Sequence, residues 1–161
     1  MYSDTIAAIA TPAGQGGVGI IRISGPRAAE VSNLISGLCP APRYAHYGIF
    51  SDRDKNKIDS GLTIFFEKPN SFTGEDVIEF HAHGGPVVLD ILLKEILQHG
   101  VRPARAGEFT ERAFLNEKIE HDSIDAVSSF KDLLDSYAAR ERIRIEIIKA
   151  MGLETPSLFF N

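Results

Sequence analysis

The sequence has a single cysteine, Cys39, no long apolar run and no excess of basic residues. One cysteine cannot form an intrachain disulfide or build a cysteine-rich zinc site. No apolar run approaches the roughly 20 residues that a membrane span requires. The segment Met1 to Thr5 lacks a positively charged stretch with an apolar core behind it, and Asp4 disfavours a transit peptide. We therefore expect a cytoplasmic protein with no membrane partner.

The overall charge is also informative. The formal net charge is −5, whereas a dedicated nucleic-acid binder usually presents a strong positive field to phosphate. Any RNA contact would have to use a local basic patch or another subunit. Hydrophobic residues make up 43% of the 161 residues and charged residues 24%, which supports a folded core rather than disorder. The length fits one domain, or one domain with a helical appendage.

Hydrophobic periodicity and breaker residues predict the order of secondary-structure elements. Strands are expected at residues 5–10, 18–24, 45–50, in a segment ending at 62–66, and at 76–81. Helices are expected from residue 26 to a stop at Gly37, at 87–98 with Gly100 as the stop, at 109–116 and at 122–149. This order has no regular βαβ alternation, so we expect an α+β fold with a mixed or antiparallel sheet and packed helices.

Two short motifs imitate nucleotide-binding elements. Gly14, Gly16 and Gly19 match the dinucleotide pattern G-x-G-x-x-G, but that pattern requires a helix directly after the last glycine, and a strand is expected there. A flexible glycine loop whose backbone must turn tightly or approach a ligand closely is the better interpretation. Asn56 to Asp59 match the guanine-reading N-K-x-D, but no G-K-[ST] exists in the sequence to hold phosphates, so we expect only a polar loop.

Two side-chain clusters raise the question of metal binding. Asp52, Asp54 and Asn56 resemble the start of a calcium loop, but Lys57 stands where that loop requires glycine. His81 and His83 alternate on one strand face with Glu79, which makes an incomplete ligand set for zinc. The alternative is that both histidines are tied to backbone or to a bound ligand. We assign no metal site.

Four segments, in order, carry a recognisable pattern. They are D-T-I at 4–6 with A-T-P at 10–12 and G-G-V-G-I-I-R-I-S-G at 16–25, P-N-S-F-T-G-E-D at 69–76, H-G-G-P at 83–86, and A-G-E-F-T-E-R-A-F-L-N-E-K at 106–118. Their order and spacing over residues 4–118 resemble the amino-terminal domain of the MnmE (TrmE) family of tRNA modification GTPases.

The resemblance implies a fold similar to the tetrahydrofolate-binding domain of aminomethyltransferases, plus a C-terminal helix. It implies a homodimer with a reduced folate, 5-formyl- or 5,10-methylenetetrahydrofolate, bound near the dimer interface. Family proteins act with the flavoprotein MnmG to install a carboxymethylaminomethyl or aminomethyl group on the wobble uridine of tRNA, and the folate supplies a one-carbon unit. Matching the family's folate contacts points to Arg22, Glu79 and Lys118 as folate-binding residues.

The chemistry of these three residues is compatible with that role. A carboxylate such as Glu79 can accept two parallel hydrogen bonds from the amino-pyrimidinone edge of a pterin. Arg22 and Lys118 can meet the carboxylates or polar ring atoms of the ligand. Without the resemblance, the same residues would be interpreted as solvated surface charges.

The resemblance divides the chain into a folate-binding and dimerisation domain at 1–118 and a helical arm with an irregular tail at 119–161. The family's GTPase domain, with its potassium and magnesium, and its terminal C-I-G-K motif are not found in this sequence. Cys39 lies in a proline-rich loop and does not replace that motif, so no catalytic residue is assigned. Two alternatives remain: a free-standing aminomethyltransferase-like protein, and a dimeric interaction module that has lost its ligand.

Overall fold

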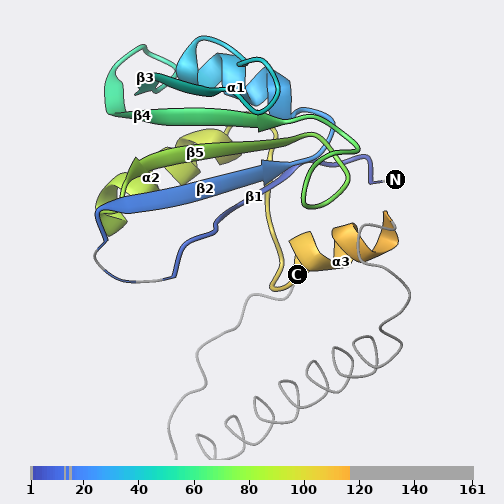
Figure 1. Cartoon of the computed structure of the whole chain (residues 1–161). Coiled ribbons are helices and arrows are strands. Elements are labelled where there is room, and N and C mark those ends of the chain that lie inside the picture. The colour runs from blue at the N-terminus through green and yellow to red at the C-terminus, as the bar shows by residue number, and fades with distance from the viewer. Residues whose placement is uncertain (1, 13, 15, 117–161) are drawn as a thin grey trace, which may run out of the picture. The chain divides into compact units, whose positions relative to one another are not determined.

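The computed structural model describes residues 2–12, 14 and 16–116, which form a mixed sheet with three helices (Figure 1). The sheet order is β3-β4-β5-β2-β1-β6, and all described neighbours are antiparallel except the parallel pair β1–β6. The strands are β1 (Ile6–Ile9), β2 (Val18–Ser24), β3 (Ala45–Ser51), β4 (Lys57–Phe66), β5 (Val77–His83) and β6 (Arg102–Pro103). The helices are α1 (Ala28–Ser36), α2 (Pro86–Leu97) and α3 (Glu108–Leu115). The prediction of an α+β fold with a mixed sheet is confirmed.

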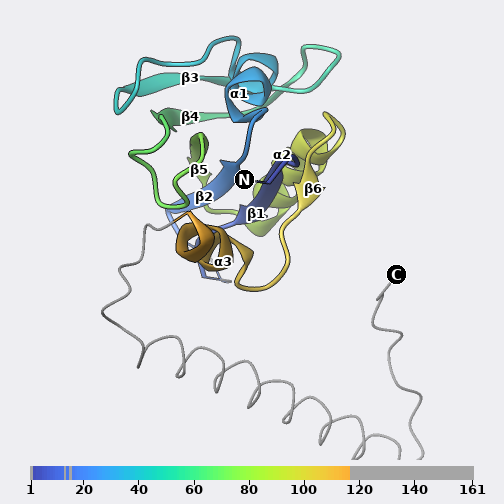
Figure 2. The same ribbon diagram turned by 90° about the vertical axis from the view of Figure 1, so that its right-hand side faces the viewer.

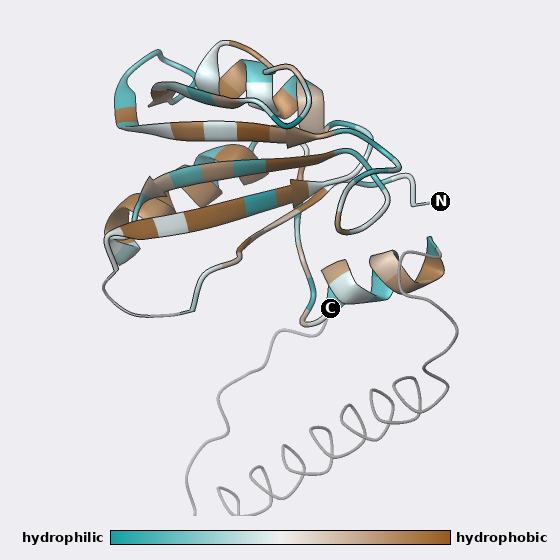
Figure 3. Ribbon diagram, in the orientation of Figure 1, coloured by the Kyte–Doolittle hydropathy of each residue, from teal (hydrophilic) through white to brown (hydrophobic). Residues whose placement is uncertain are grey.

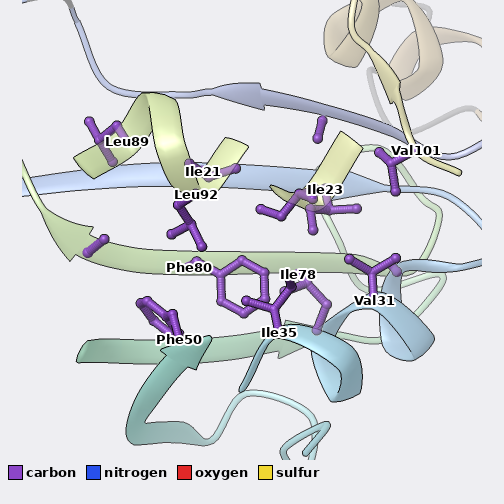
Figure 4. Close-up of a cluster of buried hydrophobic side chains, with 14 of the residues drawn as sticks. Ile21, Ile23, Val31, Ile35, Phe50, Ile78, Phe80, Leu89, Leu92 and Val101 are labelled. Atoms are coloured by element: carbon purple, nitrogen blue, oxygen red, sulfur yellow. The ribbon is translucent and has the colours of Figure 1, made fainter. Parts of the chain in front are cut away.

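Helices α1 and α2 cover one face of the sheet, and α3 lies on the other side (Figure 2). Alternate residues of the central strands point into the covered face, where Ile21 and Phe80 are fully buried against Leu92 of α2 (Figure 4). The rings of Phe50 and Phe80 meet edge-on with centroids 5.1 Å apart. Because successive side chains of a strand alternate between faces, the residues between these core positions point to the opposite, open face. The candidate site is built there.

The helix ends follow from the sequence. Gly37 closes α1 in the left-handed conformation with φ 79°, as its position predicts. Pro86 occupies the first turn of α2, where a missing backbone N–H costs nothing. Apolar residues concentrate along the central strands and α2, while the loop between β3 and β4 is hydrophilic (Figure 3). The short helix expected at 109–116 is confirmed as α3.

The sequence interpretation was wrong about two stretches of strand. Lys57 to Asp59, expected in a polar loop, begin β4 and pair with the end of β3 beside an irregularity at Phe50 and Ser51. Pairing along the hairpin outweighs the polar composition of this stretch. Strand β6 was not expected, because it is two residues long, contains Pro103 and is defined only by its pairing with the distant β1.

Phe65, near the end of β4, is buried, because it alternates onto the covered face and pairs across from Ile78. The helix expected at 122–149 and the domain boundary after residue 118 lie outside the described residues. Within the described part of the chain, no helix has the length and apolarity to cross a membrane.

Ion pairs centred on the buried Arg112 and Glu108 attach α3 to the rest of the fold. Arg112 is fully buried; its Nη2 lies 2.8 Å from Asp4 Oδ1 and 3.2 Å from Glu108 Oε1, and its Nη1 lies 3.1 Å from Glu75 Oε2. Arg102 Nη2 lies 2.6 Å from Asp4 Oδ2 and 2.6 Å from Glu108 Oε1. Removing one partner would leave a buried charge uncompensated, which is strongly destabilising. The N-terminal segment, the loop before β5 and α3 are therefore fixed to one another.

Candidate functional site

Two of the three residues predicted to bind a ligand lie side by side on the open face of the sheet. Arg22 of β2 and Glu79 of β5 are direct cross-strand partners. Arg22 Nη2 lies 2.8 Å and Nε lies 3.0 Å from Glu79 Oε1. Both side chains are largely buried, with exposed fractions of 25% for Arg22 and 13% for Glu79. The antiparallel register of β2 and β5 thus brings two residues 57 positions apart into one ion pair.

His81 extends this pair along β5. Its Nε2 lies 3.0 Å from Glu79 Oε2, so each carboxylate oxygen of Glu79 has one partner. A carboxylate has about four lone-pair sites; Arg22 occupies two of them on Oε1 and His81 one on Oε2, so about one site remains for a ligand. The sequence placed His81 on the same strand face as Glu79 but did not identify this contact.

Two aromatic rings border Arg22. The guanidinium carbon of Arg22 lies 5.1 Å from the ring centroid of Phe72 and 5.8 Å from that of Phe109. Phe72 comes from the loop before β5 and Phe109 from α3, the two segments that the buried ion pairs of Arg112 fix in place. Such contacts stabilise a cation, and the same rings offer flat apolar surface to a planar ligand. Sequence reasoning missed both roles, although each phenylalanine lies in a motif that carried the family resemblance.

A second histidine–carboxylate pair stands at the other end of β5. Asp59 of β4 accepts the His83 backbone N–H at 2.8 Å through Oδ2, and its Oδ1 lies 2.7 Å from His83 Nδ1. Burial alone would raise the pKa of the Asp59 carboxyl, but the hydrogen bonds from His83 outweigh it and hold this pKa below its ordinary value. Asp59 is therefore an ionised carboxylate at neutral pH. Sequence reasoning gave Asp59 no role, because it assigned the residue to a loop.

A cavity of about 280 Å³ adjoins this pair. It is lined by Gly17, Val18, Tyr47, Ser60, Gly61, Leu62, His81, Ala82 and His83. A close backbone approach shapes its wall, since a Cβ at Gly61 would collide with the carbonyl of His81. The strand expected after Gly17, which argued against a dinucleotide site, is confirmed as β2.

The remaining predictions for the site have different outcomes. Lys118 lies outside the described residues. His81 and His83 do not converge on one point, since each ring is held by its own carboxylate. No group of three or more potential metal ligands occurs among residues 2–12, 14 and 16–116. The open face thus presents a charged pair with aromatic neighbours at one end and a histidine–aspartate pair beside a cavity at the other.

Comparison with known proteins decides the family. Residues 5–118 match the family described as GTP-binding protein TrmE N-terminus. The chain belongs to this family. It is 54% identical over 141 residues to the tRNA modification GTPase MnmE of Stutzerimonas stutzeri and 52% identical over 141 residues to that of Chromohalobacter salexigens. The corresponding protein of Erwinia tasmaniensis is 53% identical over 143 residues.

The match to the TrmE family covers most of this chain but a minority of its relatives. Each of the three alignments includes 88% of this chain, and they include 31%, 31% and 32% of the relatives. The chain therefore corresponds to the amino-terminal domain of these tRNA modification GTPases and spans about a third of their length.

Proposed function

We propose that this chain is a folate-binding, dimerising domain that serves tRNA modification. The observation that carries the proposal is the Arg22–Glu79 pair on the open face, largely buried and bordered by Phe72 and Phe109. The family match supplies the biological context, because the relatives are named as tRNA modification GTPases. We also propose that the fold of this chain is related to that of the folate-binding domains of aminomethyltransferases.

In this proposal Glu79 anchors the pterin of a reduced folate, such as 5-formyl- or 5,10-methylenetetrahydrofolate. The site left on its Oε2 accepts one N–H of the pterin, and the second N–H of that parallel donor pair takes the place of an Arg22 or His81 contact. Arg22 orients Glu79 through two hydrogen bonds, and the rings of Phe72 and Phe109 pack against the flat ligand. Lys118 adds positive charge for the ligand's carboxylates.

Glu79→Gln tests the anchor. The substitution replaces an acceptor oxygen with an N–H donor that faces both the donors of the pterin and those of Arg22. We expect reduced-folate affinity to fall about tenfold to a hundredfold, which corresponds to roughly 1–3 kcal/mol. Calorimetric titration with 5-formyltetrahydrofolate measures the effect, and Glu67→Gln, an exposed glutamate after β4, is the matched control. Equal binding by wild type and Glu79→Gln would show that Glu79 is not the anchor.

We also propose that the open face of β3 and β4 is the dimer interface. Tyr47, Ile49 and Leu62 are 68%, 53% and 37% exposed, and Tyr47 and Leu62 are direct cross-strand partners. Exposed apolar groups on one sheet face are typical of an interface. Leu62 also pairs across from His81, so a second copy seated here would lie beside the proposed folate site, as the family resemblance implies.

Leu62→Glu tests the interface, because it places a charge in the middle of this apolar surface. We expect wild type to sediment as a dimer at micromolar concentration and Leu62→Glu as a monomer. Val87→Glu is the matched control, since Val87 is 69% exposed on α2, which covers the other face. A wild type that is monomeric at high micromolar concentration refutes the interface.

The wider role belongs to the complete assembly. We propose that the domain delivers a folate one-carbon unit to a modification of the tRNA wobble uridine, with the flavoprotein MnmG as partner. Because the chain has a net charge of −5, tRNA binding is assigned to other parts of that assembly. An assay of wobble-uridine modification, supplied with MnmG and tRNA, measures this role. It compares wild type with variants of the 5-formyltetrahydrofolate site.

A further inference from the structure

Asp59 and His83 are arranged as a proton-accepting pair. Asp59 is 11% exposed in its side chain and bonds both the backbone N–H and the ring Nδ1 of His83. These two contacts fix the position and the orientation of the imidazole. The ring itself is 71% exposed, so its far nitrogen, Nε2, is accessible.

The protonation state of the ring follows from its partner. An ionised carboxylate can only accept hydrogen bonds, so the contact to Asp59 Oδ1 requires a proton on His83 Nδ1. In the neutral ring Nε2 is then bare and able to accept a proton. Asp59 also offsets the positive charge that forms when Nε2 is protonated. His81 differs, because its Nε2 is already engaged by Glu79.

The pair lies within reach of a ligand held at Glu79. His81 and His83 line the same cavity of about 280 Å³, and His81 contacts Glu79 directly. Glu79, His81 and His83 follow one another at alternate positions of β5, so Glu79 and His83 are separated by about 13 Å along the strand. An elongated ligand anchored at Glu79 and lying along β5 would enter the cavity.

We propose that Asp59 and His83 form the general base of this site, taking a proton from an N–H or O–H group of a folate-linked reactant in the cavity beside His81. In this step the X–H bond of the reactant breaks, its electron pair stays on X, and the proton goes to His83 Nε2. The exposed ring then returns the proton to water. The inference rests on the proposed folate-binding function for the identity of the ligand, and on the geometry of the pair for its chemistry.

Nitrogen NMR of the full ¹⁵N-labelled chain tests the pair itself. At about pH 8.5, above the ordinary pKa of histidine, we expect His83 to be protonated at Nδ1 and bare at Nε2. Asp59→Asn should shift the ring toward the Nε2-protonated form that free histidine prefers, and His83→Gln assigns the signal. The proposal is overturned if the neutral wild-type ring carries its proton on Nε2, or if Asp59→Asn leaves the tautomer of His83 unchanged.

Titration with 5-formyltetrahydrofolate tests the contact with the ligand. We expect the Nε2 signal of His83 to move on binding, and His83→Gln to weaken affinity about threefold to tenfold. His99→Gln is the control, because His99 pairs with Glu95 at the end of α2. The proposal is overturned if folate binding does not move the Nε2 signal of wild-type His83 and if His83→Gln binds folate as tightly as wild type. If wild type binds no folate, the proposed function fails, and the tautomer experiment alone then decides whether the pair is a base.

Discussion

The substitution Glu108→Gln tests how firmly α3 is attached to the domain. Glu108 is fully buried and accepts four hydrogen bonds. Arg102 donates two of them, at 2.6 Å to Oε1 and 3.0 Å to Oε2; the Arg105 backbone N–H donates at 2.8 Å, and Arg112 Nη2 donates at 3.2 Å. Glutamine keeps the shape but loses the charge, and it turns one acceptor into a donor facing arginines.

The magnitude follows from the pKa of the Glu108 carboxyl. Burial alone would raise this pKa, but the hydrogen bonds from Arg102, Arg105 and Arg112 lower it from 4.5 to about 2. A carboxyl that ionises more readily in the folded chain than in the unfolded chain stabilises the fold, and this difference corresponds to about 3 kcal/mol. That stability is fully present above about pH 5, and it is lost as the pH falls through 4.5 toward 2.

Urea unfolding of the full chain measures the prediction. At pH 7 we expect Glu108→Gln to lower the free energy of unfolding by about 3 kcal/mol. Because a protonated glutamic acid is as neutral as glutamine, the difference from wild type should shrink as the pH approaches 2. Glu67→Gln, at an exposed site, should change the free energy by less than about 0.5 kcal/mol. A difference at pH 7 below about 1 kcal/mol, or one that does not depend on pH, would refute the argument.

Two further predictions concern the sheet and nucleotide binding. Gly61→Ala should lower the free energy of unfolding by more than about 2 kcal/mol in urea melts, because its Cβ would collide with the His81 carbonyl across the β4–β5 ladder. Gly17→Ala, with open space around its Cβ, should leave this free energy nearly unchanged. A larger loss of stability for Gly17→Ala than for Gly61→Ala would contradict the packing. Calorimetry should detect no micromolar guanine-nucleotide binding, because this sequence has no G-K-[ST] to hold phosphates.

Local sequence patterns predicted most elements of the fold. The β-branched run at 18–24 became β2 at the expected residues, and Gly37 ended α1 as expected. These elements were predictable because their signals are local: side-chain periodicity, turn residues and helix stops all act over a few neighbouring positions. Strand β6 was missed because its pairing with the distant β1 defines it. The first residues of β4 were missed because pairing along the β3–β4 hairpin outweighs their polar composition.

The candidate site also has features that the sequence indicated and features that only the tertiary structure decided. The family resemblance of the sequence pointed to Arg22 and Glu79 as folate contacts, which stays a prediction, and the strand pattern placed His81 and His83 on one strand face. Only the tertiary structure decided that Arg22 and Glu79 form one ion pair, that Phe72 and Phe109 border it, and that Asp59 belongs to His83. The physical reason is that strand register and the docking of α3 set these contacts. Both depend on side chains that are far apart in the chain and meet only when the whole sheet has formed.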